Sequence, residues 1–187
     1  MSKRGMLLIG MMFTLLAPMG TQAAIASQDT DSSDAGVVAK YEGRLINLAE
    51  SWEGAQYCGV YSADDVRCFS TTANMIEYEG GDSDGGVSTE DLSDCPSGPF
   101  TNEWYCLFEH SNHQGRMLKF KDTGCQSLAD FGFANQTSSW ANTLGQDAKT
   151  YDTTTCGTLL WTAPGHSNST FVGSTNNDRA SSIDIQP

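Results

Sequence analysis

The sequence predicts an all-β fold, an antiparallel Greek-key sandwich or small barrel, for the C-terminal half of the chain. From Cys95 onward, short runs rich in aromatic and branched residues alternate with Gly, Asn, Ser and Pro, and no long helical period interrupts them. These runs are EWYCLFEH, RMLKFKD, TLLWTA and STFVGS. A second observation is a repeat, because NQTSS at 135–139 returns as DRASS at 178–182. A recurrence after some forty residues indicates a duplicated supersecondary unit.

The first 26 residues have the order of a secretory signal peptide. Lys3 and Arg4 precede an apolar run, and small residues follow it. The apolar run of about fifteen residues is short for a membrane span. Cleavage after Ala26 fits an A-x-A pattern, and cleavage after Ala23 is the alternative. We therefore expect a secreted, extracellular protein, and a retained membrane anchor is the competing interpretation.

Four segments follow the signal peptide. Residues 27–39 are small and polar and predict a flexible leader, and residues 80–94 form an acidic, Gly-rich linker. Between them, residues 40–79 predict a small α+β segment, with a disulfide-closed hairpin and a short helix capped by Ser70 or Thr71. About forty residues bury little surface alone, so this segment is expected to pack against the β domain at 95–187.

Charge and cysteine content limit the classes of partner. The chain has 10 Lys and Arg against 23 Asp and Glu, a formal charge of −13, which becomes −15 when the signal peptide leaves. Such a balance argues against nucleic-acid binding. Six cysteines in an exported chain predict three disulfides, with Cys58 and Cys68 paired locally and the other four among themselves. The cysteines are Cys58, Cys68, Cys95, Cys106, Cys125 and Cys156.

One hairpin stands out in the β domain. Phe108 is followed by six residues and then by Gly115. Gly115 would supply the positive φ of a folded-over turn, and Phe108 would pack over that turn. The plainer alternative is an ordinary core aromatic residue beside an ordinary turn glycine.

These residues carry a resemblance to a known family. WYCLFEHSNHQGRMLKF at 104–120 resembles the first hairpin of a βγ-crystallin Greek key, and GFANQTSSWANT at 132–143 resembles the segment that closes it. Together with Cys106 and GCQSL at 124–128, they are similar to the secreted peptidase inhibitor family I36 (Streptomyces metalloproteinase inhibitor-like), common in actinobacteria. The resemblance implies a βγ-crystallin-like double Greek-key sandwich, preceded here by the small α+β segment, and inhibition of extracellular proteases.

The resemblance also implies calcium sites. Calcium-binding βγ-crystallins carry two Asn or Asp residues, two free positions, Ser or Thr, and Ser, once in each key. Residues 177–182 match in full, whereas 134–139 begins with Ala134. The implied ligands are the side chains of Asn135, Ser138, Asp178 and Ser181 and the backbone carbonyls of Glu109, Gln136 and Arg179.

Such calcium sites would be weak. Of the side-chain ligands only Asp178 is charged, which predicts dissociation constants of about 10⁻⁵ to 10⁻³ M. If Trp161 is the counterpart of Phe108, the second hairpin is shortened or rearranged, which puts a second ion in doubt. The alternative is that both loops are Greek-key corners whose hydroxyls bond backbone groups.

Three functions compete at this stage. The first is inhibition of extracellular proteases, metalloproteases foremost, by a rigid disulfide-stapled surface, and the second is a calcium-binding structural or stress protein without inhibitory activity. The third, an enzyme or membrane-active toxin, has little support. His110 and His113 are typical of surface imidazoles, the cysteines are expected to be oxidised, and no carboxylate pair has a catalytic frame. We therefore expect a monomeric non-enzyme that binds neither nucleic acid nor membrane.

Overall fold

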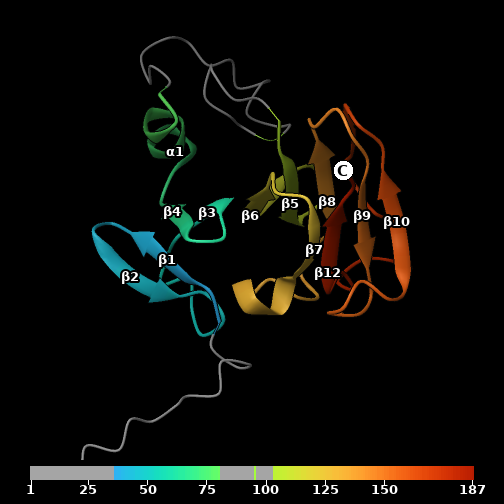
Figure 1. The fold of residues 1–187 in the computed structure, drawn as a ribbon, viewed down its shortest axis with the longest axis horizontal. Coiled ribbons are helices and arrows are strands. Elements are labelled where there is room, and N and C mark those ends of the chain that lie inside the picture. The colour runs from blue at the N-terminus through green and yellow to red at the C-terminus, as the bar shows by residue number, and fades with distance from the viewer. Residues whose placement is uncertain (1–35, 81–94, 96–102) are drawn as a thin grey trace, which may run out of the picture. The chain divides into compact units, whose positions relative to one another are not determined.

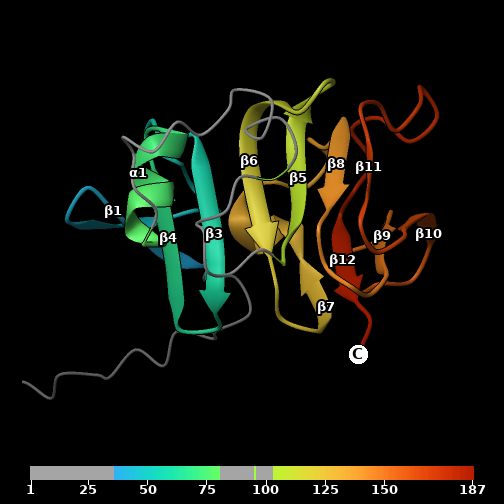
Figure 2. The same cartoon turned by 90° about the horizontal axis from the view of Figure 1, so that it is seen from above.

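The computed structural model describes residues 36–80, 95 and 103–187. These residues form two β-sheets and one short α-helix (Figures 1 and 2). The elements in chain order are β1 (Val38–Tyr41), β2 (Arg44–Asn47), β3 (Tyr57–Ser62), β4 (Asp65–Phe69), α1 (Thr72–Tyr78), β5 (Tyr105–His110), β6 (Gln114–Phe120), β7 (Gly124–Ser127), the 3₁₀ turn η2 (Leu128–Phe131), β8 (Ser139–Asn142), β9 (Ala148–Tyr151), β10 (Leu159–Ala163), β11 (Ser167–Ser169) and β12 (Ser182–Ile185). The signal peptide and nearly all of the linker lie outside the described residues.

Residues 103–187 form two interlocked Greek keys. β5 to β8 make the first key and β9 to β12 the second. The sheet orders, β11-β8-β5-β6 and β10-β9-β12-β7, show that each key places its third strand in the other key's sheet. Figure 2 shows β8, β5 and β6 side by side, with β7 and β12 crossing on the other layer. This exchange confirms the predicted double Greek-key sandwich of βγ-crystallin type.

The N-terminal segment extends the first sheet. β3 pairs in parallel with β6, and the order continues β6-β3-β4-β1-β2 to give an eight-stranded sheet. A second parallel pair joins β1 to β4. The expected packing of this segment against the β domain is thus confirmed. Both parallel pairings involve the N-terminal segment, and the strand pairs within residues 103–187 are antiparallel, as predicted. β1 begins at Val38, so the sheet starts inside the expected flexible leader at 27–39.

One hydrophobic core crosses the boundary between the N-terminal segment and the keys. Trp52 is 5 % exposed, and its indole N–H donates to the Phe131 carbonyl at 2.7 Å. Its ring lies 5.6 Å from that of Phe133. Gly132, with a φ of 59°, lets the Leu48 backbone approach, because a Cβ there would collide with the Leu48 carbonyl. The two parts therefore share one core and are joined directly.

Local expectations for the N-terminal segment are confirmed. The β3–β4 hairpin is closed by the Cys58–Cys68 disulfide. The Thr71 hydroxyl accepts the backbone N–H of Asn74 at 3.2 Å and so caps α1. The remaining disulfides are Cys95–Cys106 and Cys125–Cys156, in agreement with pairing among the four other cysteines.

Two expectations for the second key are wrong. The first strand of that key is β9, which ends at Tyr151, and Trp161 lies on β10 after the turn. The second hairpin is thus neither shortened nor built on Trp161. The run STFVGS is not a strand beyond Ser169, because β11 covers Ser167–Ser169 and a loop follows. No helix among the described residues is long and apolar enough to cross a membrane.

Candidate functional site

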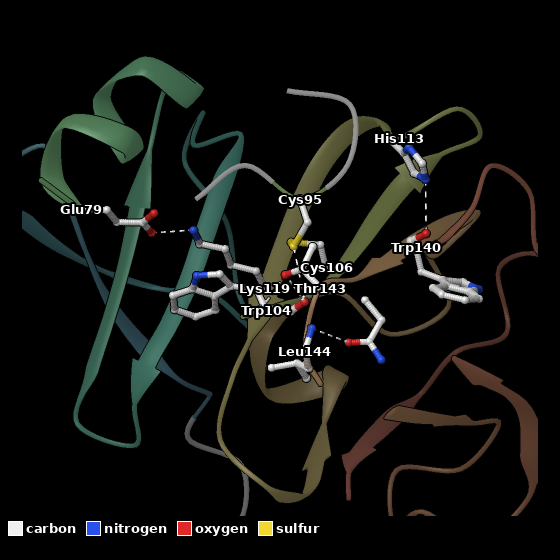
Figure 3. Close-up of a disulfide and its surroundings, with 10 residues drawn as sticks. Glu79, Cys95, Trp104, Cys106, His113, Lys119, Trp140, Thr143 and Leu144 are labelled. Carbon is white, nitrogen blue, oxygen red and sulfur yellow. Dashed lines mark hydrogen bonds and ion pairs between the residues drawn. A yellow bond between two sulfur atoms is a disulfide. The ribbon is translucent and has the colours of Figure 1, made fainter. Parts of the chain in front are cut away.

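The first hairpin has the predicted folded-over turn. Gly115 has a φ of 78°, and a Cβ there would lie 2.9 Å from the His110 ring. Phe108 is 2 % exposed, and its ring centroid lies 5.0 Å from that of His113. The His113 ring nitrogen Nε2 donates to the Trp140 carbonyl at 3.2 Å (Figure 3). His113 therefore fixes the turn to β8. Among residues 36–80, 95 and 103–187, no group of three or more His, Cys, Asp or Glu side chains could hold a metal ion.

The two corners of the keys brace each other across a pseudo-twofold axis. Asn135 and Asp178 both adopt left-handed backbone conformations, with φ values of 58° and 56°. The Asn135 N–H donates to the Ala180 carbonyl at 2.7 Å. The Asp178 N–H donates to the Thr137 carbonyl at 3.2 Å. The repeat seen in the sequence is therefore a structural repeat with reciprocal backbone contacts.

The same shift of 43 residues relates the contacts between each corner and its hairpin. The Ser138 N–H donates to the Phe108 carbonyl at 2.9 Å, and the Ser181 N–H donates to the Tyr151 carbonyl at 2.8 Å. Tyr151 is thus the counterpart of Phe108. A shift of Phe108 by the spacing already found between the corners would have identified it from the sequence.

The hydroxyl of the second serine in each corner donates a hydrogen bond that stabilises the adjacent turn. The Ser139 hydroxyl donates to the His110 carbonyl at 2.6 Å, and the Ser182 hydroxyl donates to the Thr153 carbonyl at 2.5 Å. Both hydroxyls also accept a backbone N–H, from His113 and Cys156 respectively. These two serines hold the turns closed, and neither was among the expected calcium ligands.

Three of the expected calcium-binding oxygens converge. The Ser181 hydroxyl lies 3.2 Å from Asn135 Oδ1 and 3.3 Å from the Arg179 carbonyl. Ser181 and Arg179 come from the second key and Asn135 from the first, so this group crosses the pseudo-twofold axis. The symmetry-equivalent pair is Ser138 and Asp178. The Asp178 carboxylate accepts the Asn177 side-chain amide at 2.6 Å.

The backbone carbonyls of Glu109 and Gln136 are the other two expected ligands, and the side chains of both residues bind one arginine, Arg116. Arg116 donates to the Glu109 carboxylate from its backbone N–H and its guanidinium at 3.1–3.2 Å. The same guanidinium donates to Gln136 Oε1 and stacks on the Trp52 ring at 4.8 Å. The hydrogen bonds from Arg116 hold the pKa of Glu109 below its ordinary value, against the opposing effect of partial burial. No local sequence signal pointed to Arg116, because its contacts depend on the folded hairpin.

These donors fit a hard cation at the Asn135–Ser181 group. An amide oxygen, a hydroxyl and a backbone carbonyl are ligand types that calcium takes. A hydroxyl in the same corner is also unsatisfied, because Thr137 is fully buried and its Oγ1 has no hydrogen-bond partner among the described residues. None of the three oxygens of this group belongs to a carboxylate.

A second candidate surface lies on the loops of the second key. Residues 153–177 contain no Asp, Glu, Lys or Arg, in a chain with 33 such residues. Leu159 and Phe171 on this stretch are 52 % and 49 % exposed. Charge-poor surfaces with exposed aromatic side chains are typical of the centres of protein interfaces.

The loop that presents Phe171 is fixed on both sides. The Thr170 carbonyl accepts the Asn112 N–H at 2.8 Å, and the Val172 N–H donates to the Ser138 carbonyl at 2.9 Å. The Phe171 carbonyl accepts the Ser169 hydroxyl at 2.9 Å. The exposed ring therefore projects from a backbone tied to the first key, and the sequence analysis missed it by assigning STFVGS to a strand.

Comparison with protein families identifies one segment of the chain. The model of peptidase inhibitor family I36 matches residues 88–163. Over these residues the chain is similar to peptidase inhibitor family I36. The matched segment includes all of the first key and the first two strands of the second. The resemblance found in the sequence is thereby confirmed.

The chain is also similar to solved βγ-crystallin domains. A domain from Clostridium beijerinckii is 20 % identical and covers 44 % of this chain and 97 % of its own, with a TM-score of 0.39. A βγ-crystallin from Ciona intestinalis has the same identity and covers 44 % of this chain and 99 % of its own, with a TM-score of 0.40. The N-terminal domain of protein S is 22 % identical over 44 % of this chain and 94 % of its own, with a TM-score of 0.38. None of the curated proteins compared with the chain matches it.

Proposed function

We propose that the protein is a secreted inhibitor that binds extracellular proteases, metalloproteases foremost. The match of residues 88–163 to peptidase inhibitor family I36 carries this proposal. Three disulfides suit an oxidising extracellular environment. The family and the sandwich fold point to a binding protein rather than an enzyme.

The contact surface lies on the stretch 153–177, which has no charged side chain of its own, with Phe171 as its anchor. A large aromatic side chain on a fixed backbone loses little conformational freedom on binding. Aromatic residues of this kind dominate the binding energy of many interfaces. The loop requires no ordering, because its backbone is already bonded to Asn112 and Ser138.

The experiment is a titration of the mature protein against an extracellular zinc metalloprotease of thermolysin type and a serine protease of subtilisin type. We expect stoichiometric inhibition of the metalloprotease and a rise of the inhibition constant by about tenfold or more in Phe171→Ala, the range of an interface hot spot. Leu45→Ala is the matched control, since Leu45 is 69 % exposed on β2, far along the sheet from the second key. Equal effects of the two variants would remove Phe171 from the interface. If the protein inhibits neither protease class, the proposal that it is a protease inhibitor is refuted.

A second function, calcium binding at the two corners, is favoured by one observation. The Ser181 hydroxyl lies within hydrogen-bond distance of both Asn135 Oδ1, from the other key, and the Arg179 carbonyl. A cation bound there would stabilise the fold, because it binds only the folded chain. On this proposal Asp178 and Ser138 form the equivalent group, with the carbonyls of Glu109 and Gln136.

Thermal unfolding in EDTA and in a few millimolar calcium tests the second function. We expect calcium to raise the Tm by several degrees, and each of Asn135→Ala and Asp178→Ala to lose part of that rise. Asp122→Ala is the control, since it removes an exposed carboxylate outside the corners. An identical Tm with and without calcium would leave the corners as purely structural turns.

A further inference from the structure

Each key places one acidic residue directly after the last aromatic residue of its first strand. Glu109 follows Phe108 at the end of β5, and Asp152 follows Tyr151 at the end of β9. The two acids are 43 residues apart, so the pseudo-twofold axis that relates the corners also relates them. Glu109 carries one of the carbonyls expected to bind calcium, and Asp152 is its equivalent in the second key.

In the first key the carboxylate is held by Arg116. The guanidinium donates to both oxygens of Glu109 at 3.1 Å and also donates to Gln136 Oε1. Its position is fixed further by the Trp52 ring at 4.8 Å and the Phe133 ring at 5.7 Å. The Arg116 and Glu109 side chains are 21 % and 27 % exposed. A bidentate, stacked and half-buried pair of this kind is more persistent than an ordinary surface ion pair.

In the second key a different arginine reaches the equivalent carboxylate. Arg179 occupies the sequence position equivalent to Gln136, and it donates to Asp152 Oδ2 at 2.5 Å. Its second guanidinium nitrogen donates to the Thr175 carbonyl at 3.0 Å. Arg116 comes from β6 and Arg179 from the corner itself, yet both bring a guanidinium to the acid that follows the first-strand aromatic residue. The two keys therefore form equivalent arginine–carboxylate pairs with arginines from different positions in the key.

We infer that Arg116 and Arg179 are built-in cations of the two corners, each neutralising an acidic side chain beside the residues expected to bind calcium. This inference rests on the proposed calcium function, since it concerns the control of that same site. A guanidinium beside a cation site repels the incoming ion, and it also cancels the charge of an acid that would attract the ion. The coupling is reciprocal, so the arginine–carboxylate pair lowers calcium affinity, and bound calcium weakens the pair. The corners thus keep their charge balance when calcium is absent.

The two arginine–carboxylate ion pairs differ in how firmly they are held. Arg116 is held by Glu109, Gln136 and Trp52, whereas Arg179 is 44 % exposed and its partner Asp152 is 29 % exposed. Water and salt screen an exposed pair more than a half-buried one. The Arg116 pair therefore lowers calcium affinity more than the Arg179 pair does. The corner beside Arg179 is expected to bind calcium first as the calcium concentration rises.

The test is isothermal titration of calcium chloride into the full mature chain at low ionic strength. We expect Arg116→Gln and Arg179→Gln each to bind calcium about tenfold more tightly than the unsubstituted chain, within the range typical of two coupled sites. Arg44→Gln is the matched control, because it makes the same change of net charge at an arginine paired with Glu53 on the N-terminal segment. Arg116→Lys keeps the cation and is expected to leave calcium affinity low.

The outcomes separate this inference from the calcium function. Tighter binding by the Arg116→Gln or Arg179→Gln variant, with none by the unsubstituted chain, supports the inference and removes calcium as a natural ligand. Calcium binding by the unsubstituted chain that neither variant improves beyond Arg44→Gln overturns the inference and leaves the calcium function standing. No binding by any of the variants overturns both. Because Arg179 is exposed, Arg179→Gln is expected to fold even if Arg116→Gln does not.

Discussion

Thr137 is a fully buried residue in the first corner, and its hydroxyl has no hydrogen-bond partner among the described residues. Its backbone carbonyl accepts the Asp178 N–H, so the residue is fixed at the junction of the two keys. The equivalent position in the second key is Ala180, which is also fully buried. The structure therefore needs the backbone of Thr137 but not its hydroxyl.

Thr137→Val is expected to raise the free energy of unfolding. A buried hydroxyl without a partner costs about 1–3 kcal/mol, and valine has nearly the same shape. Urea unfolding without calcium measures the change, expected to be about 1 kcal/mol. Thr150→Val is the matched control, because the hydroxyl of buried Thr150 is hydrogen-bonded to the Tyr105 hydroxyl at 2.8 Å, and its loss should destabilise the fold. Equal destabilisation by both substitutions would show that Thr137 has a partner in solution.

Residue identities in the corners could be predicted only where the sequence repeats. Asn135 and Asp178 were found because an amide and an acid recur at a fixed distance before two serines, and both have positive φ. Tyr151 was missed because Trp161 was taken as the aromatic residue of the second key, without applying the same shift. Arg116 could not be found, because its contacts with Glu109 and Gln136 exist only once the hairpin has folded over the corner.

At the scale of elements, local features were predictable and long-range pairings were not. The β3–β4 hairpin and the capped helix α1 each depend on residues close together in the chain, including the disulfide across ten positions. The parallel pairing of β3 with β6 joins strands on either side of the linker. Parallel strands are not connected by a tight turn, so no turn residues in the sequence indicate the pairing. The sequence therefore predicted that the N-terminal segment packs on the keys without predicting how.

The loop after β11 shows a further limit of propensity. STFVGS has the branched and aromatic residues typical of a strand, yet only Ser169 of that run lies in β11. The loop is instead fixed by single hydrogen bonds to Asn112 and Ser138 in the other key. Such bonds come from the interlocking of the keys, so they leave no local trace in the sequence.

For the whole molecule, a buried ion pair joins the N-terminal segment to the keys. Lys119 on β6 donates to the Glu79 carboxylate at 2.5 Å, and both side chains are almost fully buried (Figure 3). Glu79 caps the C-terminal end of α1 and also accepts the Tyr61 hydroxyl at 2.6 Å. The Lys119 ammonium lies 4.3 Å from the Trp104 ring centroid. The junction between the two parts thus contains charge as well as apolar surface.

This pair gives the stability of the fold an unusual pH dependence. Burial lowers the pKa of Lys119 from 10.5 to about 8, and the attraction of Glu79 only partly opposes that effect. Between these values the unfolded chain keeps the lysine proton and the folded chain releases it. Stability rises with pH wherever the unfolded chain binds more protons, so Lys119 is expected to add stability from pH 8 toward pH 10. Above pH 10 the burial-raised pKa of Tyr61 and of Tyr105 acts in the opposite direction.

Urea unfolding of the full mature chain at pH 7.5 and pH 9.5 measures this dependence. The unsubstituted chain is expected to gain stability relative to Lys119→Met between the two pH values, whatever the stability of that variant at either pH. Lys40→Met is the control, because Lys40 is exposed on β1 and should leave the difference between the two pH values unchanged. If the unsubstituted chain and Lys119→Met respond equally to pH, Lys119 stays protonated in the folded state throughout this range. Glu79 would then hold the lysine charge more firmly than burial opposes it, and the two parts of the molecule would be joined by a permanent ion pair.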